Sequence, residues 1–305
     1  MKPRETHSFI ELPETYRAMP RWWHEGPDWL DALPETVRAL CQRWRLTRDG
    51  AVSHGSNALV VPVRRGGERL ALRVTPPDAR TVDEIRALRF WNGRGTVRLV
   101  DADPAVGASL LERLDSERSL ARLPLDEAVP IIARVMRRLA VSAPPDVPST
   151  ASLIRARVVT LEPDWERLGR PFERRVLDAA ITAATELVQT SPARASLAVN
   201  GDLHFAQVLA GTREPWLAVD PVLLRGDIEY DLARILWTRL DEMTDVDVVR
   251  YIRTIVCEAG LDHERALAWI TYRTVDYWLW GLEYGLTEDP VRCARLANIV
   301  LAFRS

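Results

Sequence analysis

Residues 199–209 read Val199-Asn200-Gly201-Asp202-Leu203-His204-Phe205-Ala206-Gln207-Val208-Leu209, and Asp220 follows Gln207 by thirteen positions within Leu217-Ala218-Val219-Asp220-Pro221. Apolar runs alternate here with polar turns, which predicts two short strands, each followed by a turn. Side chains in these turns meet where the strands end beside each other. The sequence therefore predicts that the Gln207 amide lies near two carboxylates, Asp202 and Asp220.

One amide and two carboxylates are a set that phosphoryl transfer requires. In that reaction one carboxylate accepts the proton of the attacking hydroxyl, and oxygen ligands hold magnesium against the nucleotide phosphates. We assign Asp202 as the catalytic base and Gln207 and Asp220 as metal ligands. Turn chemistry alone is the alternative, because Asp and Asn are common in turns for conformational reasons.

A second motif, Gly226-Asp227-Ile228-Glu229-Tyr230-Asp231-Leu232-Ala233, follows the first. Together with Gly201-Asp202-Leu203-His204 and Asp220-Pro221 it resembles the aminoglycoside phosphotransferases, and within them the streptomycin 6-phosphotransferase and hydroxyurea phosphotransferase branch. The similarity runs from about Trp22 to near the C-terminus. It implies an α+β, two-lobed protein-kinase-like fold, with a small antiparallel-sheet N-lobe and a larger, mostly helical C-lobe.

The resemblance also implies a reaction. Members use ATP, and some relatives GTP, with Mg²⁺ to phosphorylate a hydroxyl of a small molecule. The expected acceptor is an aminoglycoside such as streptomycin, which implies a role in antibiotic resistance. Two alternatives stay open: a kinase-fold protein that binds without transferring phosphate, and a kinase of an amino sugar or another metabolite.

Two positions depart from the family pattern H-G-D-x-H-x-x-N. Asn200 replaces the first histidine, and Gln207 replaces the metal-binding asparagine. The glutamine amide oxygen lies one methylene further out, so it reaches magnesium only if the backbone retreats, and the geometry around this ion is strict. We expect Asn200 to contact the substrate. The departures are the reason why the non-transferring alternative stays open.

His204 and Asp231 are expected to support the catalytic loop from behind. The His204 imidazole can hydrogen-bond the backbone and fix the turn around Asp202. Asp227 and Asp231 lie four residues apart at the start of a helix expected to run to Leu240, with Asp227 near its positive N-terminal end. In the family this segment buttresses the magnesium-binding turn, so we favour structural support over chemistry.

Composition limits the class of protein. The chain has 305 residues, 47% of them apolar, which suits one large domain or two domains with full cores. A net charge of -2 argues against a nucleic-acid binder. No uncharged run reaches the length of a membrane helix, which is about 18 residues or more, and the N-terminus lacks the apolar stretch of a signal peptide. We expect a cytoplasmic protein that is not bound to membranes.

Three segments are expected. Residues 1–20 form an N-terminal arm, residues 21–115 a nucleotide-binding N-lobe, and residues 116–305 a helical C-lobe with the catalytic loop and the substrate site. In the N-lobe, helices precede antiparallel strands between Leu46 and Val74. In the C-lobe, helices surround a small strand pair that carries the active site, with predicted bounds 125–141, 153–161, 172–188, 226–240, 246–258, 263–285 and 289–303.

The first nucleotide element is the sequence Ser53-His54-Gly55-Ser56-Asn57, which lies where kinase-like folds bend a loop over the phosphates. Small residues let backbone amides approach phosphate oxygens. We therefore expect Gly55, Ser56 and Asn57 to bind ATP, although Gly55 also suits an ordinary hairpin.

The second nucleotide element is Arg73, which stands where kinases carry the lysine of V-A-I-K. Lys2 is the one lysine of the chain, and the other 40 of its 41 basic residues are arginine. Arg73 therefore suggests a charge-retaining replacement, although its planar fork does not copy an ammonium group. Glu84 is the expected partner, Asp83 competes with it, and a solvated surface carboxylate is the alternative.

The third nucleotide element is the stretch Glu112-Arg113-Leu114, which follows two apolar residues. It resembles the family's hinge, where backbone amides and carbonyls recognise adenine. Glu112 and Leu114 are therefore expected to bind the nucleotide.

The predicted helix from His263 to Gly285 places Asp276, Trp280 and Glu283 on one face. Carboxylates beside aromatic rings suit a cationic or sugar-like substrate. The streptomycin kinases of the resembling branch carry a similar Trp and Glu. In the alternative, the aromatic residues belong to the core and the acids are exposed. The sequence leaves monomer and homodimer open.

Overall fold

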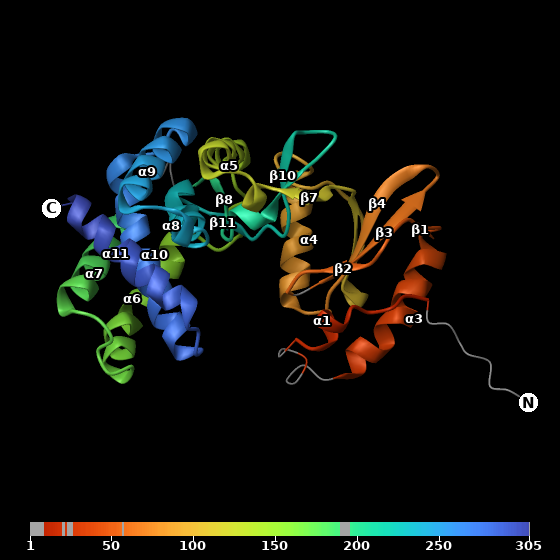
Figure 1. Cartoon of the computed structure of the whole chain (residues 1–305), viewed down its shortest axis with the longest axis horizontal. Coiled ribbons are helices and arrows are strands. Elements are labelled where there is room, and N and C mark those ends of the chain that lie inside the picture. Colours follow the sequence, from red (N-terminus) through yellow and green to blue (C-terminus); the bar gives the residue numbers. More distant parts are fainter. Residues whose placement is uncertain (1–8, 20–21, 23–26, 57, 190–195, 305) are drawn as a thin grey trace, which may run out of the picture. The chain divides into compact units, whose positions relative to one another are not determined.

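The computed structural model describes residues 9–19, 22, 27–56, 58–189 and 196–304, and the chain forms two compact units (Figure 1). The first unit comprises residues 1–93 and 97–114, and the second comprises residues 94–96 and 115–305. The chain thus passes into the second unit for three residues, returns, and leaves the first unit finally after Leu114.

The first unit is built on a six-stranded antiparallel sheet. Its strands are β1 (Thr47–Arg48), β2 (Ser53–His54), β3 (Leu59–Arg65), β4 (Glu68–Val74), β5 (Leu99–Asp103) and β6 (Ala108–Glu112). The strand order is β1-β3-β4-β6-β5, and β2 pairs with β3. Gly66 and Gly67 close the β3–β4 hairpin with φ angles of 54° and 90°, which glycine adopts without strain.

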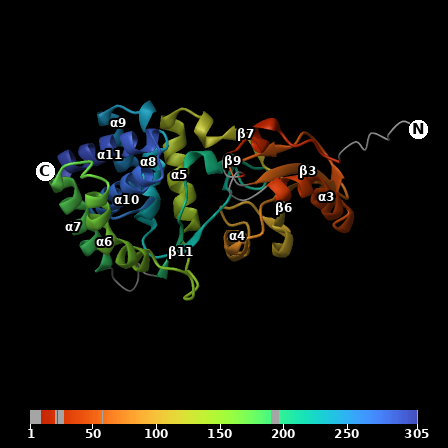
Figure 2. The same cartoon turned by 90° about the horizontal axis from the view of Figure 1, so that it is seen from below.

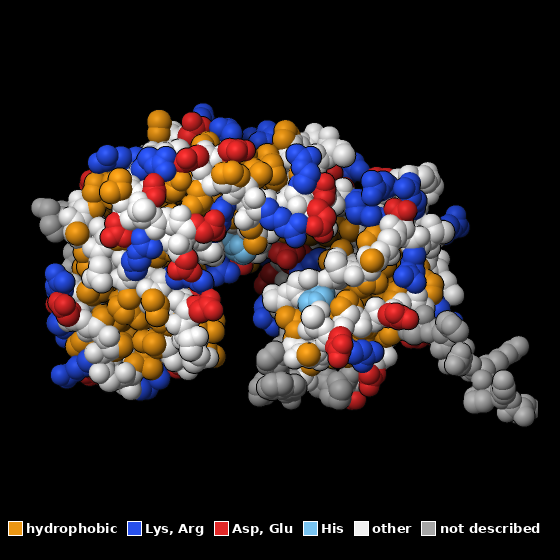
Figure 3. Space-filling view, in the orientation of Figure 1, with side chains coloured by type: hydrophobic (Ala, Val, Ile, Leu, Met, Phe, Trp, Pro, Cys, Tyr) orange, Lys and Arg blue, Asp and Glu red, His pale blue; other side chains and the backbone are white. Residues whose placement is uncertain are grey.

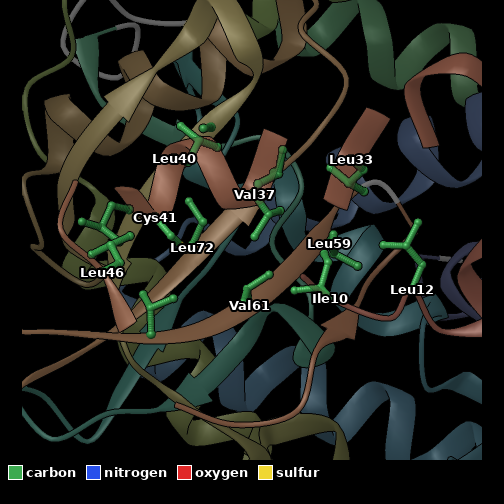
Figure 4. Packing of buried hydrophobic residues seen from close by; sticks show 14 of the residues in the cluster. Ile10, Leu12, Leu33, Val37, Leu40, Cys41, Leu46, Leu59, Val61 and Leu72 are labelled. Carbon is green, nitrogen blue, oxygen red and sulfur yellow. The ribbon is translucent and has the colours of Figure 1, made fainter. Parts of the chain in front are cut away.

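Helices cover one face of this sheet. Side chains alternate between buried and partly exposed along β3, and the buried ones meet α3 (Pro27–Arg43). Figure 4 shows Leu33, Val37 and Leu40 of α3 packing toward Leu59 and Val61.

The described part of the expected N-terminal arm belongs to this core. Ile10, Leu12 and Tyr16 are buried in it, and Tyr16 lies in the short helix α1 (Glu14–Arg17). Residues 1–8 and 20 of that arm lie outside the described residues.

Helix α4 (Ala79–Trp91) follows β4 and carries Glu84. The Asp78 side chain caps it by accepting a hydrogen bond of 2.9 Å from the Thr81 N–H, which satisfies one free donor of the first turn. The helix ends at Asn92, whose φ of 46° is left-handed. After β5, a single turn (Pro104–Val106) leads into β6.

The second unit is mainly helical (Figure 2). Its helices are α5 (Leu125–Leu139), α6 (Thr150–Arg167), α7 (Arg174–Val188), α8 (Leu232–Trp237), α9 (Asp245–Ala259), α10 (His263–Glu283) and α11 (Glu288–Arg304). Helix α10 packs against α7, α8 and α11, and its Trp269 is fully buried. Helix α6 begins earlier than predicted because a reciprocal Ser149–Ser152 capping box starts it, and it also ends later, at Arg167. Among the described helices, none has the length and hydropathy needed to cross a bilayer.

The short strands of the second unit correct one prediction. They are β7 (Asp115–Ser119), β8 (Ala198–Asn200), β9 (Val208–Ala210), β10 (Trp216–Ala218) and β11 (Leu223–Arg225). Strand β8 pairs with β11, whereas β9 lies between β10 and β7, so the two strands flanking Asp202 do not pair with each other. A seven-residue connection with a 3-10 turn (Phe205–Gln207) separates them, and a tight hairpin does not form.

The predicted helix from Gly226 to Leu240 is also wrong as a single element. It divides into a 3-10 turn (Ile228–Asp231), α8, and a second 3-10 turn (Leu240–Glu242). Gly226 is not helical: its φ is 138°, and a Cβ there would lie 2.1 Å from the Thr150 hydroxyl oxygen. Asp227 consequently precedes the first turn and caps no helix with its side chain.

Acidic and basic side chains are interspersed over the face of the molecule in Figure 3. Each unit shows both signs there, as the small net charge of the sequence implies.

Candidate active site

The loop between β8 and the 3-10 turn carries Asp202. Asn200 stabilises this loop, since its buried Oδ1 accepts hydrogen bonds from the N–H groups of Asp202 (3.4 Å) and Val222 (3.2 Å). The Gly201 N–H donates to the Val222 carbonyl at 2.9 Å. A Cβ on Gly201 would lie 2.6 Å from a methyl carbon of Leu224, so only glycine permits this close approach to β11.

Both oxygens of the Asp202 carboxylate are engaged. Oδ1 lies 2.5 Å from Nε of Arg234, and Oδ2 accepts a hydrogen bond of 3.1 Å from the Gln207 side-chain amide. The side chain remains 34% exposed. Burial raises the pKa of Asp202 above its ordinary value, and the positive charge of Arg234 opposes that rise. The carboxylate is thus fixed in orientation and still open to a second reactant.

Gln207 and Asp220 lie at the end of neighbouring strands. The Val219 N–H donates to the Gln207 carbonyl at 2.8 Å, which places Asp220 one residue from that contact. Asp220 has a left-handed φ of 49°, which aspartate tolerates better than most residues.

The donor set fits magnesium. The Gln207 Oε1 atom is buried and makes no hydrogen bond to any described residue, whereas buried acceptors are normally satisfied. Magnesium is bound through one or two protein oxygens, with waters and substrate phosphates completing the shell.

The chain matches the family described as aminoglycoside/hydroxyurea antibiotic resistance kinase over residues 43–285. The chain belongs to that family. It is 38% identical over 296 residues to the streptomycin 6-kinase of Streptomyces glaucescens, covering 93% of this chain and 95% of that one. It is 36% identical over 291 residues to the hydroxyurea phosphotransferase of Kitasatospora aureofaciens, covering 90% of this chain and 81% of that one. The predicted family and the assignment as a small-molecule kinase are confirmed.

Solved structures confirm the fold class. The aminoglycoside phosphotransferase APH(4)-Ia superposes with a TM-score of 0.57 at 17% identity, over 87% of this chain and 98% of that one. The choline kinase LicA of Streptococcus pneumoniae superposes with a TM-score of 0.58 at 13% identity, over 88% and 99%. The kinase therefore has the α+β, protein-kinase-like fold that the resemblance implies.

Of the two acids of the second motif, Asp231 holds the loop of this kinase and Asp227 makes a different contact. The buried Asp231 accepts a hydrogen bond of 3.4 Å from the Leu203 N–H, next to Asp202, and burial raises its pKa well above the ordinary value. Asp227 instead accepts from the Trp269 ring nitrogen at 2.9 Å and from the Arg265 guanidinium. It thereby ties the chain after β11 to α10.

The predicted hydrogen bond of the His204 ring to the loop backbone is absent among the described residues. The loop is fixed through the His204 carbonyl, which accepts from the Gln207 N–H at 3.0 Å. Burial and the charge of Arg234 lower the pKa of His204 to about 4, so the ring is neutral near pH 7. His204 packs in the loop as a neutral group.

In the first unit, Arg73 and Glu84 form a buried ion pair of 2.8 Å. Of the two carboxylates considered for this role, Glu84 is the partner. Strand β4 and helix α4 thus present a fixed positive group whose charge is already partly compensated.

Two of the other residues expected to bind the nucleotide, Gly55 and Glu112, use their backbone N–H groups in hydrogen bonds within the first unit. The Gly55 N–H donates to the Ala58 carbonyl at 3.0 Å, Ser56 is exposed, and Asn57 lies outside the described residues. The Glu112 N–H donates to the Arg98 carbonyl at 3.0 Å. Glu112 therefore uses its amide within the sheet, and its carboxylate accepts from the Arg98 N–H at 2.7 Å. Nucleotide binding by Glu112 and Leu114 stays a prediction.

The expected substrate residues have different environments. The prediction for Asn200 is wrong: its side chain is buried at 2% exposure and holds the loop. Asp276 lies 2.6 Å from Arg157, and Glu283 lies 3.0 Å from Arg167. Trp280 is 41% exposed and stacks on Tyr277. Asp276 and Glu283 are therefore ion-paired, and Glu283 is also exposed, as the core-and-surface alternative has it.

Sequence reasoning missed Arg234, the closest cationic neighbour of Asp202. It also missed Arg273, whose guanidinium donates to the Tyr230 hydroxyl at 2.6 Å and lies 4.0 Å above that ring. The positive charges of Arg273 and Arg234 oppose the rise that burial causes in the pKa of Asp231. Arg234 lies in α8, whereas Asp231 ends the preceding 3-10 turn, so no helical spacing in the sequence linked Arg234 to the catalytic loop.

Proposed function

We propose that this kinase is an ATP- and magnesium-dependent O-phosphotransferase whose acceptor is an aminoglycoside of the streptomycin type. The observation that carries the proposal is the Asp202 carboxylate, held on both oxygens beside a Gln207 oxygen that accepts no hydrogen bond from any residue the structure describes. Kinship to streptomycin 6-kinases over almost the whole chain supports the acceptor.

In this mechanism Asp202 accepts the proton of the acceptor hydroxyl as its oxygen bonds to the γ-phosphorus of ATP. The bond from that phosphorus to the bridging oxygen breaks, and ADP leaves. Gln207 and Asp220 would hold magnesium, which supplies charge neutralisation on the phosphate oxygens. The Gln207 amide group links the two roles because its nitrogen orients Asp202.

We assign residues 21–115 to nucleotide binding and residues 116–305 to catalysis and acceptor binding. The buried Arg73–Glu84 ion pair supports the first assignment, since it joins the strand and the helix where kinases pair a cation with a glutamate. GTP is the alternative nucleotide.

For the acceptor we assign Asp276, Trp280 and Glu283. Trp280 and Tyr284 have ring centroids 4.8 Å apart and are 41% and 66% exposed, which supports a surface for planar cationic groups. A pocket of about 350 Å³, lined by Tyr230, Tyr272 and Asp276 among others, supports an acceptor of sugar size.

The experiment that tests the proposal is phosphorylation of purified streptomycin with ATP and Mg²⁺, followed by mass spectrometry and ³¹P NMR of the product. Parallel reactions with hydroxyurea and an amino sugar test the other acceptor classes. We expect a streptomycin monophosphate, and none when EDTA is added. Nucleotide binding by calorimetry without any phosphorylated product would instead support the non-transferring alternative and overturn the proposal.

The phosphate loop gives a second, sharper test. A Cβ on Gly55 meets nothing within 4 Å, and its φ is not left-handed, so Gly55→Ala should fold normally. If this loop covers the phosphates, the added methyl group should raise KM for ATP about tenfold, corresponding to about 1.4 kcal/mol.

Gly66→Ala is the matched control. It also adds its methyl group in open space, but at a φ of 54°, so it should cost about 1 kcal/mol of stability with an unchanged KM for ATP. Equal KM values for the two variants would contradict the assigned phosphate loop.

A further inference from the structure

We propose that Arg234 is a positioning residue for phosphoryl transfer, which holds the Asp202 carboxylate in the orientation that accepts the hydroxyl proton. The inference rests on the proposed function, because it assigns a role within that same site. It is carried by the 2.5 Å contact between Arg234 Nε and Asp202 Oδ1.

The contact leaves Asp202 able to react. An ionised carboxylate offers about four lone-pair sites on its two oxygens. The Gln207 amide takes one on Oδ2, whereas Arg234 Nε pairs with Oδ1 through charge at 2.5 Å and makes no hydrogen bond to any described residue. Each oxygen keeps a free lone pair, while the two contacts prevent rotation of the group. A base that is already oriented loses less rotational freedom when the transition state forms.

The Arg234 side chain lies beside two stacked aromatic rings, those of Trp237 and Tyr277. Its guanidinium carbon lies 6.0 Å from the Trp237 ring centroid and 5.8 Å from that of Tyr277. These two rings stack at 4.5 Å with an angle of 11° between their planes, and Trp237 is buried. The Tyr277 hydroxyl donates to Asp289 at 3.0 Å, which fixes the outer ring. Three contacts therefore restrict a long side chain that would otherwise sample many rotamers.

A lysine cannot reproduce this arrangement. Its ammonium group is a compact point charge without a planar face, whereas the guanidinium contacts the carboxylate and lies beside flat rings at the same time. Charge alone would therefore restore only part of the function. This difference separates positioning from simple charge compensation.

The test compares Arg234→Met and Arg234→Lys with the wild type in the streptomycin assay. We expect Arg234→Met to lower kcat about 10- to 100-fold with KM for both substrates changed less than about threefold. Arg234→Lys should recover part of that loss. Arg250→Met is the matched control, since Arg250 also combines an ion pair to a carboxylate with a position over a tyrosine ring, on α9. Its kcat should equal that of the wild type.

Binding measurements separate misfolding from lost positioning. Calorimetric titration of ATP into Arg234→Met should give a Kd within threefold of the wild-type value, which shows a folded nucleotide site. A wild-type kcat in Arg234→Met, or a loss confined to KM, would overturn the inference while the proposed function stands. A wild-type enzyme that phosphorylates none of the acceptors would overturn the proposed function and this inference with it.

Discussion

Asp202→Asn is expected to lower kcat about a thousandfold or more, because the variant loses the group that accepts the hydroxyl proton and orients the acceptor. Asparagine keeps the volume of the side chain, and its Oδ1 can still face Arg234. Steady-state kinetics with ATP and streptomycin measure the effect. KM for ATP should change little, since no contact to the nucleotide is assigned to Asp202.

Asp245→Asn is the control for this substitution. Asp245 is exposed at the start of α9 and pairs with Arg295, away from the catalytic loop. It should retain wild-type turnover. Turnover of Asp202→Asn within tenfold of the wild type would contradict the assignment of Asp202 as base.

Asp227→Ala is expected to destabilise the protein by about 3–5 kcal/mol, the usual cost of removing one partner from a buried ion pair. The Asp227 side chain is 1% exposed and holds both Arg265 and the Trp269 ring nitrogen. Its loss removes the charged partner of the Arg265 guanidinium, which keeps its hydrogen bond to the Leu187 carbonyl, and removes the acceptor of the buried indole N–H. Urea unfolding followed by circular dichroism measures the change.

Asp178→Ala provides the comparison on an exposed pair. Asp178 lies 2.8 Å from Arg174 on the surface of α7, with 54% of its side chain exposed, so about 0.5 kcal/mol or less is expected. The double variant Asp227→Ala/Arg265→Met should recover part of the loss, because it removes the uncompensated charge. Similar losses of unfolding free energy for Asp178→Ala and Asp227→Ala would show that burial does not increase the contribution of the Asp227–Arg265 pair to stability.

Local patterns in the sequence predicted much of the fold. Apart from residues 226–240, the helix periodicities from Leu125 onward correspond to real helices because each reflects a single element with one buried face. The β3–β4 hairpin is also a local feature, fixed by two glycines. Arg73 and Glu84 could be paired from their positions on a strand and the following helix.

Non-local features could not be predicted in this way. The partners of β8 and β9 are β11 and β10, and strand pairing between such short segments leaves little trace in either sequence. The burial of Asn200 depends on the Val222 N–H, which lies 22 residues away. Arg234 is one of 40 arginines, so its type alone carries no information, and only the fold brings it to Asp202.

The three-residue excursion Arg94–Thr96 affects where the kinase can be divided. The Ala218 N–H donates to the Gly95 carbonyl at 2.9 Å, and Arg213 donates to the Thr96 carbonyl at 3.0 Å. A fragment that begins at Asp115 would therefore expose the edge of β10, one turn before Asp220. The second unit is discontinuous in the sequence, so a single cut in the coding sequence cannot separate two intact units.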